Sequence, residues 1–180
     1  MSSARFSLFE TPIGMCGLVW REGAVVGFQL PEREALATRE RLSKRFPLAR
    51  ETGEDDGMDG VIVRVRGVLA GAADDLRDIE IDLEGCNAFA RRVYAVTREI
   101  APGTTLTYGE VTRRIGEGPQ AARSVGRALG ANPVPVIIPC HRVTAASGKA
   151  GGFSAPGGVG VKLRLLQIEA RHGPGLPLFS

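Results

Sequence analysis

The stretch from Asn132 to Val143 constrains the fold of this chain more than any other part of its sequence. It reads NPVPVIIPCHRV, an apolar run that holds three prolines and carries an adjacent cysteine and histidine, Cys140 and His141. Each proline fixes its own φ angle and removes a backbone donor, which stiffens the segment. The sequence therefore predicts a rigid loop that presents a reactive pair of side chains.

Cys140 and His141 are the residue types of a nucleophile and its base. The thiolate is the nucleophile of a cysteine, and a nearby imidazole can take the proton directly or through one water. An acidic residue that orients the imidazole would complete the relay. Glu169 is the candidate, because it stands near the carboxyl end of a helix expected over about 161–170, where the helix dipole disfavours a negative charge. Two alternatives stay open: an inert buried cysteine, and a glutamate that simply pairs with Arg171.

Two short helices joined by a turn form the second pattern. Thr107 is expected to cap a helix over 108–115, with Glu110 at its third position as in a capping box. Residues 116–119, Gly-Glu-Gly-Pro, predict a turn, and a second helix is expected over about 120–129. This is the order of a helix-turn-helix, although such turns also occur in proteins that do not bind DNA.

The second of these helices has an unusually smooth face, on which small residues surround Arg123 and Arg127. A major-groove reader presents long polar side chains to the base edges, whereas a smooth face with an inserted arginine suits a minor groove. A tightly packed core helix is the alternative, and it explains the small residues but not Arg123. The small residues are Ala121, Ala122, Ser124, Gly126 and Ala128.

Charge is divided unevenly along the chain. Residues 1–85 hold 11 Lys and Arg against 16 Asp and Glu, a net charge of −5, whereas residues 86–180 hold 12 against 4, a net charge of +8. The second half is therefore the part expected to face a phosphate backbone. An uneven split by chance is the alternative, so charge alone does not decide.

The composition favours a globular protein without a leader, a membrane span or a metal site. Hydrophobic residues make up 43% and charged residues 24% of the 180 residues. The first ten residues lack a continuous apolar core, and no apolar run reaches the length of a membrane span, so the expected location is the cytoplasm. Three widely spaced cysteines and two histidines argue against a disulfide framework and against a zinc site. Cys16 and Cys86 are expected to be structural.

Short apolar segments dominate the first half of the chain. They predict strands at 6–10, 17–20 and 24–30, followed by a helix over 32–46. Residues 61–69 fit either a strand or a helix. The other expected elements are a loop over 51–60, a strand over 79–83 and a helix over 87–99 that Asn87 caps.

These elements indicate the fold class α+β with two domains. A small N-terminal α/β domain over residues 1–85 would combine an antiparallel sheet with a helix. A helical C-terminal domain over residues 86–180 would carry a winged-helix-like helix-turn-helix and the reactive loop.

The motifs described above resemble those of the O6-alkylguanine-DNA alkyltransferases, also called methylated-DNA–protein-cysteine methyltransferases. PCHRV at 139–143 is similar to the core of that family's active-site motif, AARSVG at 121–126 to its recognition helix, and TYG at 107–109 to the segment before it. The likeness covers about residues 86–170, with weaker support from TPIG at 11–14. Two separated motifs in the family's order argue against a chance match.

The resemblance implies a role for each matching residue. Cys140 would take the alkyl group from O6-alkylguanine in double-stranded DNA by a single displacement. His141 would draw off its proton through water, and Glu169 would steady His141. Arg123 would fill the gap left by a flipped guanine, while Tyr108 would help to rotate the base out and to protonate the leaving guanine.

The resemblance also implies supporting contacts. Asn132 would hold the turn before Cys140 by side-chain to backbone hydrogen bonds. No cofactor or metal is implied. The sequence leaves the oligomeric state open, with a monomer as the default expectation. One molecule would repair one lesion, because a thioether has no good leaving group. The base pocket would be lined by Phe153, Ser154, Val143 and Pro135, and the DNA would meet Ala121, Ala122, Ser124 and Gly126 beside Arg123.

Some positions depart from the family's pattern. Phe153 stands where members commonly carry tyrosine, and Tyr94 stands where tryptophan is common. These departures leave the preference for methyl or larger alkyl groups open. Three other functions are alternatives. A lesion-flagging relative would lack Cys140, and a winged-helix regulator would need base-reading side chains. A Cys-His hydrolase would need an oxyanion hole and turnover.

Overall fold

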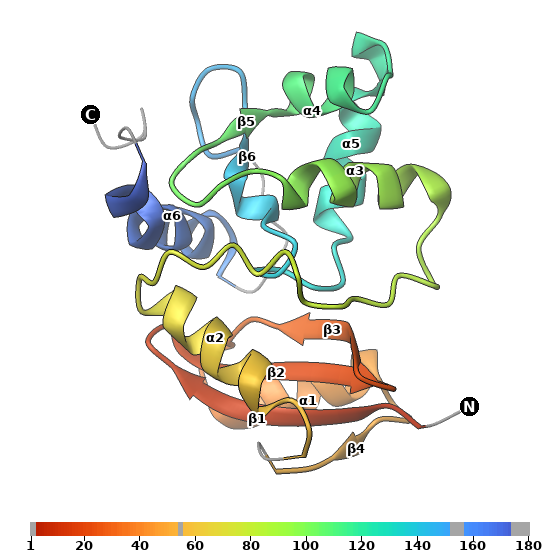
Figure 1. Cartoon of the computed structure of the whole chain (residues 1–180), viewed down its shortest axis with the longest axis vertical. Coiled ribbons are helices and arrows are strands. Elements are labelled where there is room, and N and C mark those ends of the chain that lie inside the picture. Colours follow the sequence, from red (N-terminus) through yellow and green to blue (C-terminus); the bar gives the residue numbers. More distant parts are fainter. Residues whose placement is uncertain (1–2, 54–55, 152–156, 174–180) are drawn as a thin grey trace. The chain divides into compact units, whose positions relative to one another are not determined.

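The computed structural model of this protein describes residues 3–53, 56–151 and 157–173 (Figure 1). It is a mixed α+β fold, as expected from the sequence. The two domains predicted from the sequence, 1–85 and 86–180, remain a prediction, because a compact arrangement does not show that each part folds by itself. The chain divides into two compact units, of which unit 1 comprises Met1–Asp82 and Pro133–Pro135 and unit 2 comprises Leu83–Asn132 and Val136–Ser180.

Unit 1 is built on a four-stranded sheet with the strand order β3-β2-β1-β4 (Figure 1). The pairs β1–β2 and β2–β3 are antiparallel, and β4 runs parallel to β1. Glu22 and Gly23, between β2 and β3, have φ angles of 53° and 85°, the signs that a type I′ hairpin turn requires. The three strands predicted before residue 31 are confirmed. The bounds are β1 Arg5–Thr11, β2 Gly14–Arg21, β3 Ala24–Gln29 and β4 Arg50–Glu51.

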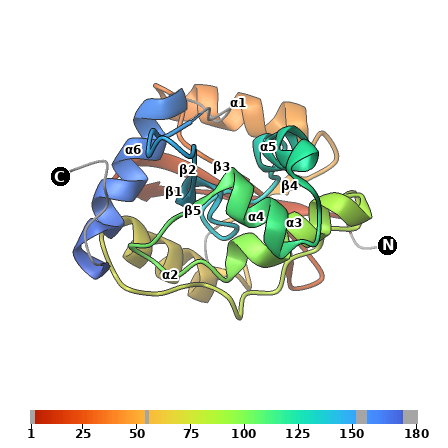
Figure 2. The ribbon, with the colours of Figure 1, turned by 90° about the horizontal axis from the view of Figure 1, so that it is seen from above.

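Two helices cover opposite faces of this sheet (Figures 1 and 2). α1 (Ala35–Arg45) buries Leu42 in the hydrophobic cluster of one face. α2 (Asp59–Leu69) lies on the other face, where the Arg66 guanidinium stands 5.5 Å from the centre of the Phe9 ring. The predicted helix over 32–46 is confirmed, and the segment 61–69, which fitted either a strand or a helix, is helical.

The predicted strand over 79–83 does not form. Ile81 makes only an isolated bridge to Val25 of β3. Further along the same edge, the Phe28 backbone N–H donates to the Pro133 carbonyl at 2.9 Å. Because two distant segments share the free edge of β3, neither pairs with it over more than a few residues. The loop predicted over 51–60 is shortened at its ends by β4 and α2.

Unit 2 is mainly helical, with α3, α4 and α5 packed together and α6 packed against the turn that contains Cys140 (Figure 2). Asn87 caps α3 as predicted, accepting a hydrogen bond from the Ala90 N–H at 2.8 Å. Thr107 and Glu110 form the predicted capping box of α4. The bounds are α3 Ala88–Arg98, α4 Tyr108–Arg114, α5 Ala122–Gly130 and α6 Gly158–Glu169, with 3-10 turns η1 Pro119–Ala121, η2 Cys140–Arg142 and η3 Ala170–His172 and a parallel pair β5 Leu106–Thr107 and β6 Val143–Thr144.

The helices of unit 2 follow the predicted order, with α4, a turn and α5 in succession. α6 begins at Gly158, about one turn earlier than predicted, after Gly157 in the left-handed region. Within the three described ranges, no helix has both the length and the apolar character needed to cross a membrane.

Candidate active site

Cys140 begins a tight turn in unit 2. Its backbone N–H donates to the Ile138 carbonyl at 2.8 Å, and the Arg142 N–H donates to the Pro139 carbonyl at 2.9 Å. The Asn132 side chain donates from Nδ2 to the same Ile138 carbonyl at 2.9 Å, which is the kind of contact predicted for it. The turn is therefore fixed by hydrogen bonds on both sides, and Cys140 is buried.

The backbone is strained just before this turn. Val136 has a φ angle of 75°, in a region that a β-branched residue rarely adopts. Such a conformation costs about 1–3 kcal/mol and persists only where the surroundings enforce it. Val136 and the next two residues, Ile137 and Ile138, are buried. Packing of the apolar run therefore adds to the stiffness that its prolines predict.

Some features around the Cys140 thiol raise its pKa and others lower it. Burial raises the pKa of Cys140 above its usual range, because desolvation disfavours the thiolate. A hydrogen bond with Asn132, the positive charge of Lys162 and the backbone N–H groups of Cys140 and His141 lower that pKa, but burial prevails. The side chain at rest is therefore a protonated thiol, which needs a base to become a nucleophile.

A buried carboxylate holds the imidazole of His141, the residue that follows Cys140 in the chain. His141 Nε2 lies 2.9 Å from Glu169 Oε1. Burial raises the pKa of Glu169, but the charges and hydrogen bonds of His141 and Arg142 outweigh it and hold the pKa well below its usual range. The ionised carboxylate can only accept, so Nε2 carries the imidazole proton. Nδ1 is buried and makes no hydrogen bond within the described part of the chain, so in the neutral form of the imidazole it is the atom that can accept a proton.

Arg142 is the second partner of Glu169. Its Nε donates to Oε2 at 2.9 Å and its Nη2 to Oε1 at 2.7 Å, a bidentate pair. Its Nη1 donates to the Ile100 carbonyl at 2.6 Å. The sequence offered Arg171 as the structural partner of Glu169, but the cation that pairs with it here is Arg142, from the reactive turn. Glu169 therefore orients His141 and also anchors the turn to α6.

The backbone of Gly103 lies against the Glu169 carboxylate. Its N–H points to Glu169 Oε2 at 3.5 Å, and its φ angle is 77°. A Cβ at this position would lie 2.5 Å from the backbone nitrogen of Gly173 and 2.9 Å from the Glu169 carbonyl oxygen. Only glycine fits this conformation and this close approach of two backbones.

Tyr108, the first residue of α4, lies between α5 and α6. A Cβ built on Gly126 of α5 would be 3.9 Å from Tyr108 Cε1, and the Lys162 Nζ of α6 is 5.8 Å from the centre of the ring. Burial raises the pKa of the Tyr108 phenol, and the negative charge of Cys140 raises it further. The phenol therefore stays protonated at neutral pH and can donate a hydrogen bond or a proton.

Lys162 is part of this site, and the sequence analysis missed it. It is only 1% exposed, and its Nζ donates to the Val143 carbonyl at 2.6 Å. A helical signal could have found it, because positions 162, 165, 166 and 169 follow the i, i+3, i+4, i+7 spacing of a buried stripe.

α5 presents the face predicted to meet DNA. Arg123 and Ser124 are exposed, whereas Val125, Ala128 and Leu129 are buried and hold the helix to its unit. The small residues are thus divided between both sides of the helix. Ala121, Ala122 and Gly126 are half-buried.

Of the four residues predicted to line the base pocket, Val143 is the one that the structure describes within unit 2. Val143 is fully buried and adjoins the reactive turn. Pro135 groups with unit 1, so its predicted contact with the base stays a prediction. Phe153 and Ser154 lie outside the described residues.

The other two cysteines differ from Cys140. Cys16 is buried in β2, and burial raises its pKa to about 12 although a hydrogen bond with Thr11 lowers it. Cys86 is half-buried. A thiol with so high a pKa as that of Cys16 is inert at neutral pH.

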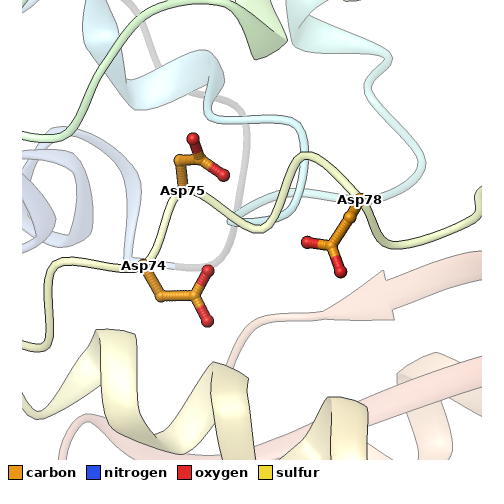
Figure 3. A group of neighbouring side chains, drawn as sticks. All are labelled: Asp74, Asp75 and Asp78. Atoms are coloured by element: carbon orange, nitrogen blue, oxygen red, sulfur yellow. The ribbon is translucent and has the colours of Figure 1, made fainter.

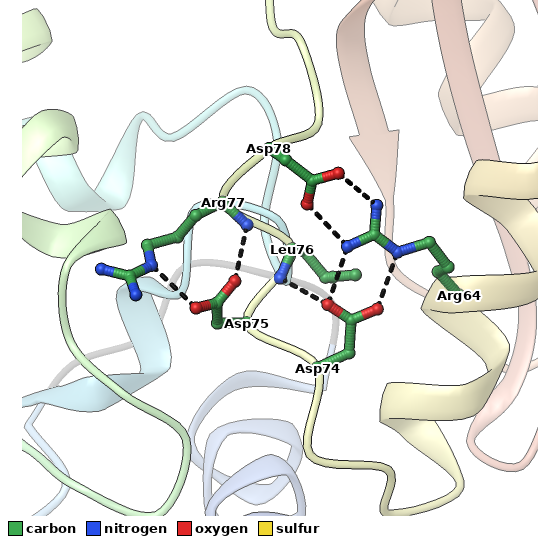
Figure 4. A network of polar contacts seen from close by, with 6 residues as sticks. All are labelled: Arg64, Asp74, Asp75, Leu76, Arg77 and Asp78. Atoms are coloured by element: carbon green, nitrogen blue, oxygen red, sulfur yellow. Dashed lines mark hydrogen bonds and ion pairs between the residues drawn. The ribbon is translucent and has the colours of Figure 1, made fainter.

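Three aspartates of unit 1 gather closely enough to raise the question of a cation site (Figure 3). One carboxylate oxygen from each of Asp74, Asp75 and Asp78 lies within 4.8 Å of the others. Arg64 donates to Asp74 and Asp78 at 2.7–2.8 Å, and Arg77 donates to Asp75 at 2.8 Å (Figure 4). Each of the three carboxylates therefore pairs with an arginine, and Arg64 ties the segment after α2 back to that helix.

Comparisons with known proteins agree with one another. Residues 88–171 match the family model described as the DNA-binding domain of 6-O-methylguanine DNA methyltransferase. The methylated-DNA–protein-cysteine methyltransferase of Mycolicibacterium paratuberculosis is 36% identical over 172 residues, which cover 95% of this chain and 96% of that protein. The protein of the same name from Mycobacterium bovis is 40% identical over 72% of this chain and 76% of its own length. The crystal structure of Mycobacterium tuberculosis OGT in complex with DNA is similar at 30% identity and a TM-score of 0.74, covering 98% of this chain and 99% of the other.

Proposed function

Because this chain belongs to the family of methylated-DNA–protein-cysteine methyltransferases, we propose that it repairs DNA by transferring an alkyl group from O6 of guanine to its own Cys140. The observation that carries the proposal is a buried thiol at Cys140, followed in the chain by an imidazole whose Nε2 is held 2.9 Å from Glu169. A Nδ1 with an available lone pair is what a cysteine with a raised pKa needs as a base.

The proposed reaction is one displacement at saturated carbon. The proton of the Cys140 thiol moves to His141 Nδ1, directly or through one water, and Glu169 stabilises the imidazolium. The thiolate sulfur then attacks the alkyl carbon, a new C–S bond forms, and the C–O6 bond breaks with its electron pair left on guanine. Tyr108 donates a proton to that guanine. The thioether has no good leaving group, so each molecule reacts once.

The proposed approach to DNA uses α5. The O6 atom is paired inside the duplex, so the base must leave the stack at a cost of a few kcal/mol. Arg123, exposed on α5, would occupy the gap, and the small residues around it would let the helix approach the minor groove. The net charge of +8 in residues 86–180 favours the phosphate backbone. In this proposal α4 and α5 act as a winged-helix-like helix-turn-helix.

The finer parts of the proposal concern the rest of the chain. Phe153, Ser154, Val143 and Pro135 line the pocket for the flipped base. The protein works as a monomer in the cytoplasm without a cofactor, and the N-terminal domain supports the C-terminal one.

Transfer of labelled methyl groups tests the proposal directly. Duplex DNA carrying O6-methylguanine with a radioactive methyl group is incubated with the protein, beside the Cys140→Ala variant and a Cys86→Ala control. The proposal predicts that label reaches the wild type and the control, saturates near one methyl per chain, and is absent from Cys140→Ala. Binding to the DNA without uptake of label would overturn it and favour a lesion-flagging protein.

A further inference from the structure

Lys162 is a charged residue in a place where charge is costly. It stands on α6 in the same buried stripe as Leu165, Leu166 and Glu169, and it is 1% exposed. Lysine is seldom buried unless its ammonium has partners. Lys162 and Glu169 are two helical turns apart, so one face of α6 supplies both a buried anion and a buried cation.

The contacts of Lys162 lead to the reactive turn. Its Nζ donates to the Val143 carbonyl at 2.6 Å. The Val143 N–H in turn donates to the Cys140 carbonyl and closes the turn η2. The ammonium also lies 5.8 Å from the centre of the Tyr108 ring, within the range of a cation–π contact. Lys162 therefore contacts the segment that holds Cys140 and lies within cation–π range of the Tyr108 ring.

The other charged groups of the site already pair with one another. Arg142 and Glu169 form a bidentate pair, so their charges largely cancel. When His141 takes the thiol proton, its new charge faces Glu169 at 2.9 Å. A neutral donor would satisfy the Val143 carbonyl equally well, at a smaller desolvation cost than an ammonium. A buried cation is explained better by a nearby anion, and the anion formed in this turn is the Cys140 thiolate.

We propose that Lys162 is a positioning residue whose ammonium charge, held between the Val143 carbonyl and the Tyr108 ring, favours the thiolate of Cys140. The inference rests on the proposed function, in which Cys140 is the acceptor. Among the described residues, the titratable groups that face Lys162 include Cys140 from η2 and Tyr108 from α4.

The pKa values point the same way. Burial lowers the pKa of Lys162 to about 8, and the negative charge of Cys140 acts against that fall. The charge of Lys162 in turn lowers the pKa of Cys140. The support is present below about pH 8, where the ammonium is charged, and is lost as the pH rises through that value.

Three proteins test the inference: the wild type, Lys162→Gln and Lys162→Arg. Glutamine keeps a donor for the Val143 carbonyl but removes the charge, whereas arginine keeps the charge. The rate at which iodoacetamide alkylates Cys140 is followed against pH by peptide mass spectrometry, with Cys86 as the internal reference. Circular dichroism reports whether each variant is folded.

At pH 7, where the ammonium is charged, alkylation of Cys140 should be about tenfold slower in Lys162→Gln than in the wild type, as expected when loss of a nearby opposite charge raises the pKa of the thiol. The rate should stay within about twofold of the wild type in Lys162→Arg, and the rate at Cys86 should not change. Transfer from O6-methylguanine at pH 7 should fall several-fold in Lys162→Gln. A folded Lys162→Gln with the wild-type profile would show that Lys162 only holds the turn, and would overturn the proposal.

Failure of the wild type to take methyl groups from DNA would refute the proposed function alone, because the alkylation of Cys140 by iodoacetamide proceeds without DNA.

Discussion

Removing the charge of Glu169 should damage stability and chemistry by different amounts. The Glu169→Gln variant leaves the Arg142 guanidinium, 2% exposed and bound at 2.7 Å and 2.9 Å to the carboxylate, without its anion. Breaking a buried pair in this way costs about 3–5 kcal/mol. For a chain of this size that corresponds to a fall in Tm of roughly 10 °C. Transfer should also slow, because the imidazolium of His141 loses its partner.

A matched double variant separates the two effects. Replacing Arg142 by methionine together with Glu169→Gln removes the unpaired charge, so most of the lost stability should return while transfer stays slow. Urea unfolding gives the free energies, and single-turnover transfer of labelled methyl groups gives the rates. If Glu169→Gln unfolds at the wild-type urea concentration, or if the double variant is less stable than both single variants, the account of this network is wrong.

The same carboxylate predicts how stability depends on pH. Its pKa in the folded protein is held well below the ordinary value of 4.5. A lowered folded pKa means that the stabilisation is fully present above the unfolded pKa and is lost as the pH falls towards the folded one. Between about pH 5 and pH 2, wild-type stability should therefore fall more steeply than that of Glu169→Gln. Equal slopes in urea titrations would contradict the ionised, paired state of Glu169.

Two further variants probe DNA recognition and the support of the site. Arg123→Ala should slow repair of duplex DNA by at least about tenfold, since an unfilled gap restores a base-unstacking cost of a few kcal/mol. Alkylation of Cys140 by iodoacetamide should stay at the wild-type rate. A parallel loss in both assays would mean that Arg123 acts on folding. Gly103→Ala should destabilise the protein by roughly 1–3 kcal/mol, because its Cβ meets the Gly173 nitrogen at 2.5 Å; the control Gly60→Ala, on α2 with open space around it, should be neutral in the same urea titration.

Local signals were sufficient for the parts of the fold that depend on neighbours in sequence. The capping box of Thr107 and Glu110 and the cap at Asn87 predicted where two helices begin, because each cap is made within three residues. The strand predicted over 79–83 failed for the opposite reason. Its alternation of residues was right for a strand, but the edge of β3 is shared with Pro133, which lies far away in the sequence.

The site was predicted in its chemistry but not in its charges. The pair Cys140–His141 is visible as a dipeptide, and Glu169 was found from its unfavourable place in a helix. Arg142 was seen only as part of a motif, because its partner is 27 residues away. Lys162 was missed because a lysine in an apolar stripe was not weighed as a buried cation. Such pairings are decided by tertiary contacts, which a single sequence does not reveal.

The claim that Cys140 is the alkyl acceptor is tested most directly by mapping the product. The wild-type protein is incubated with duplex DNA carrying one O6-methylguanine, digested, and analysed by mass spectrometry. The account predicts one added methyl group per chain, on the peptide that contains Cys140, with Cys16 and Cys86 unmodified and guanine restored in the DNA. A methyl group on another residue, or repaired DNA with an unmodified protein, would contradict it.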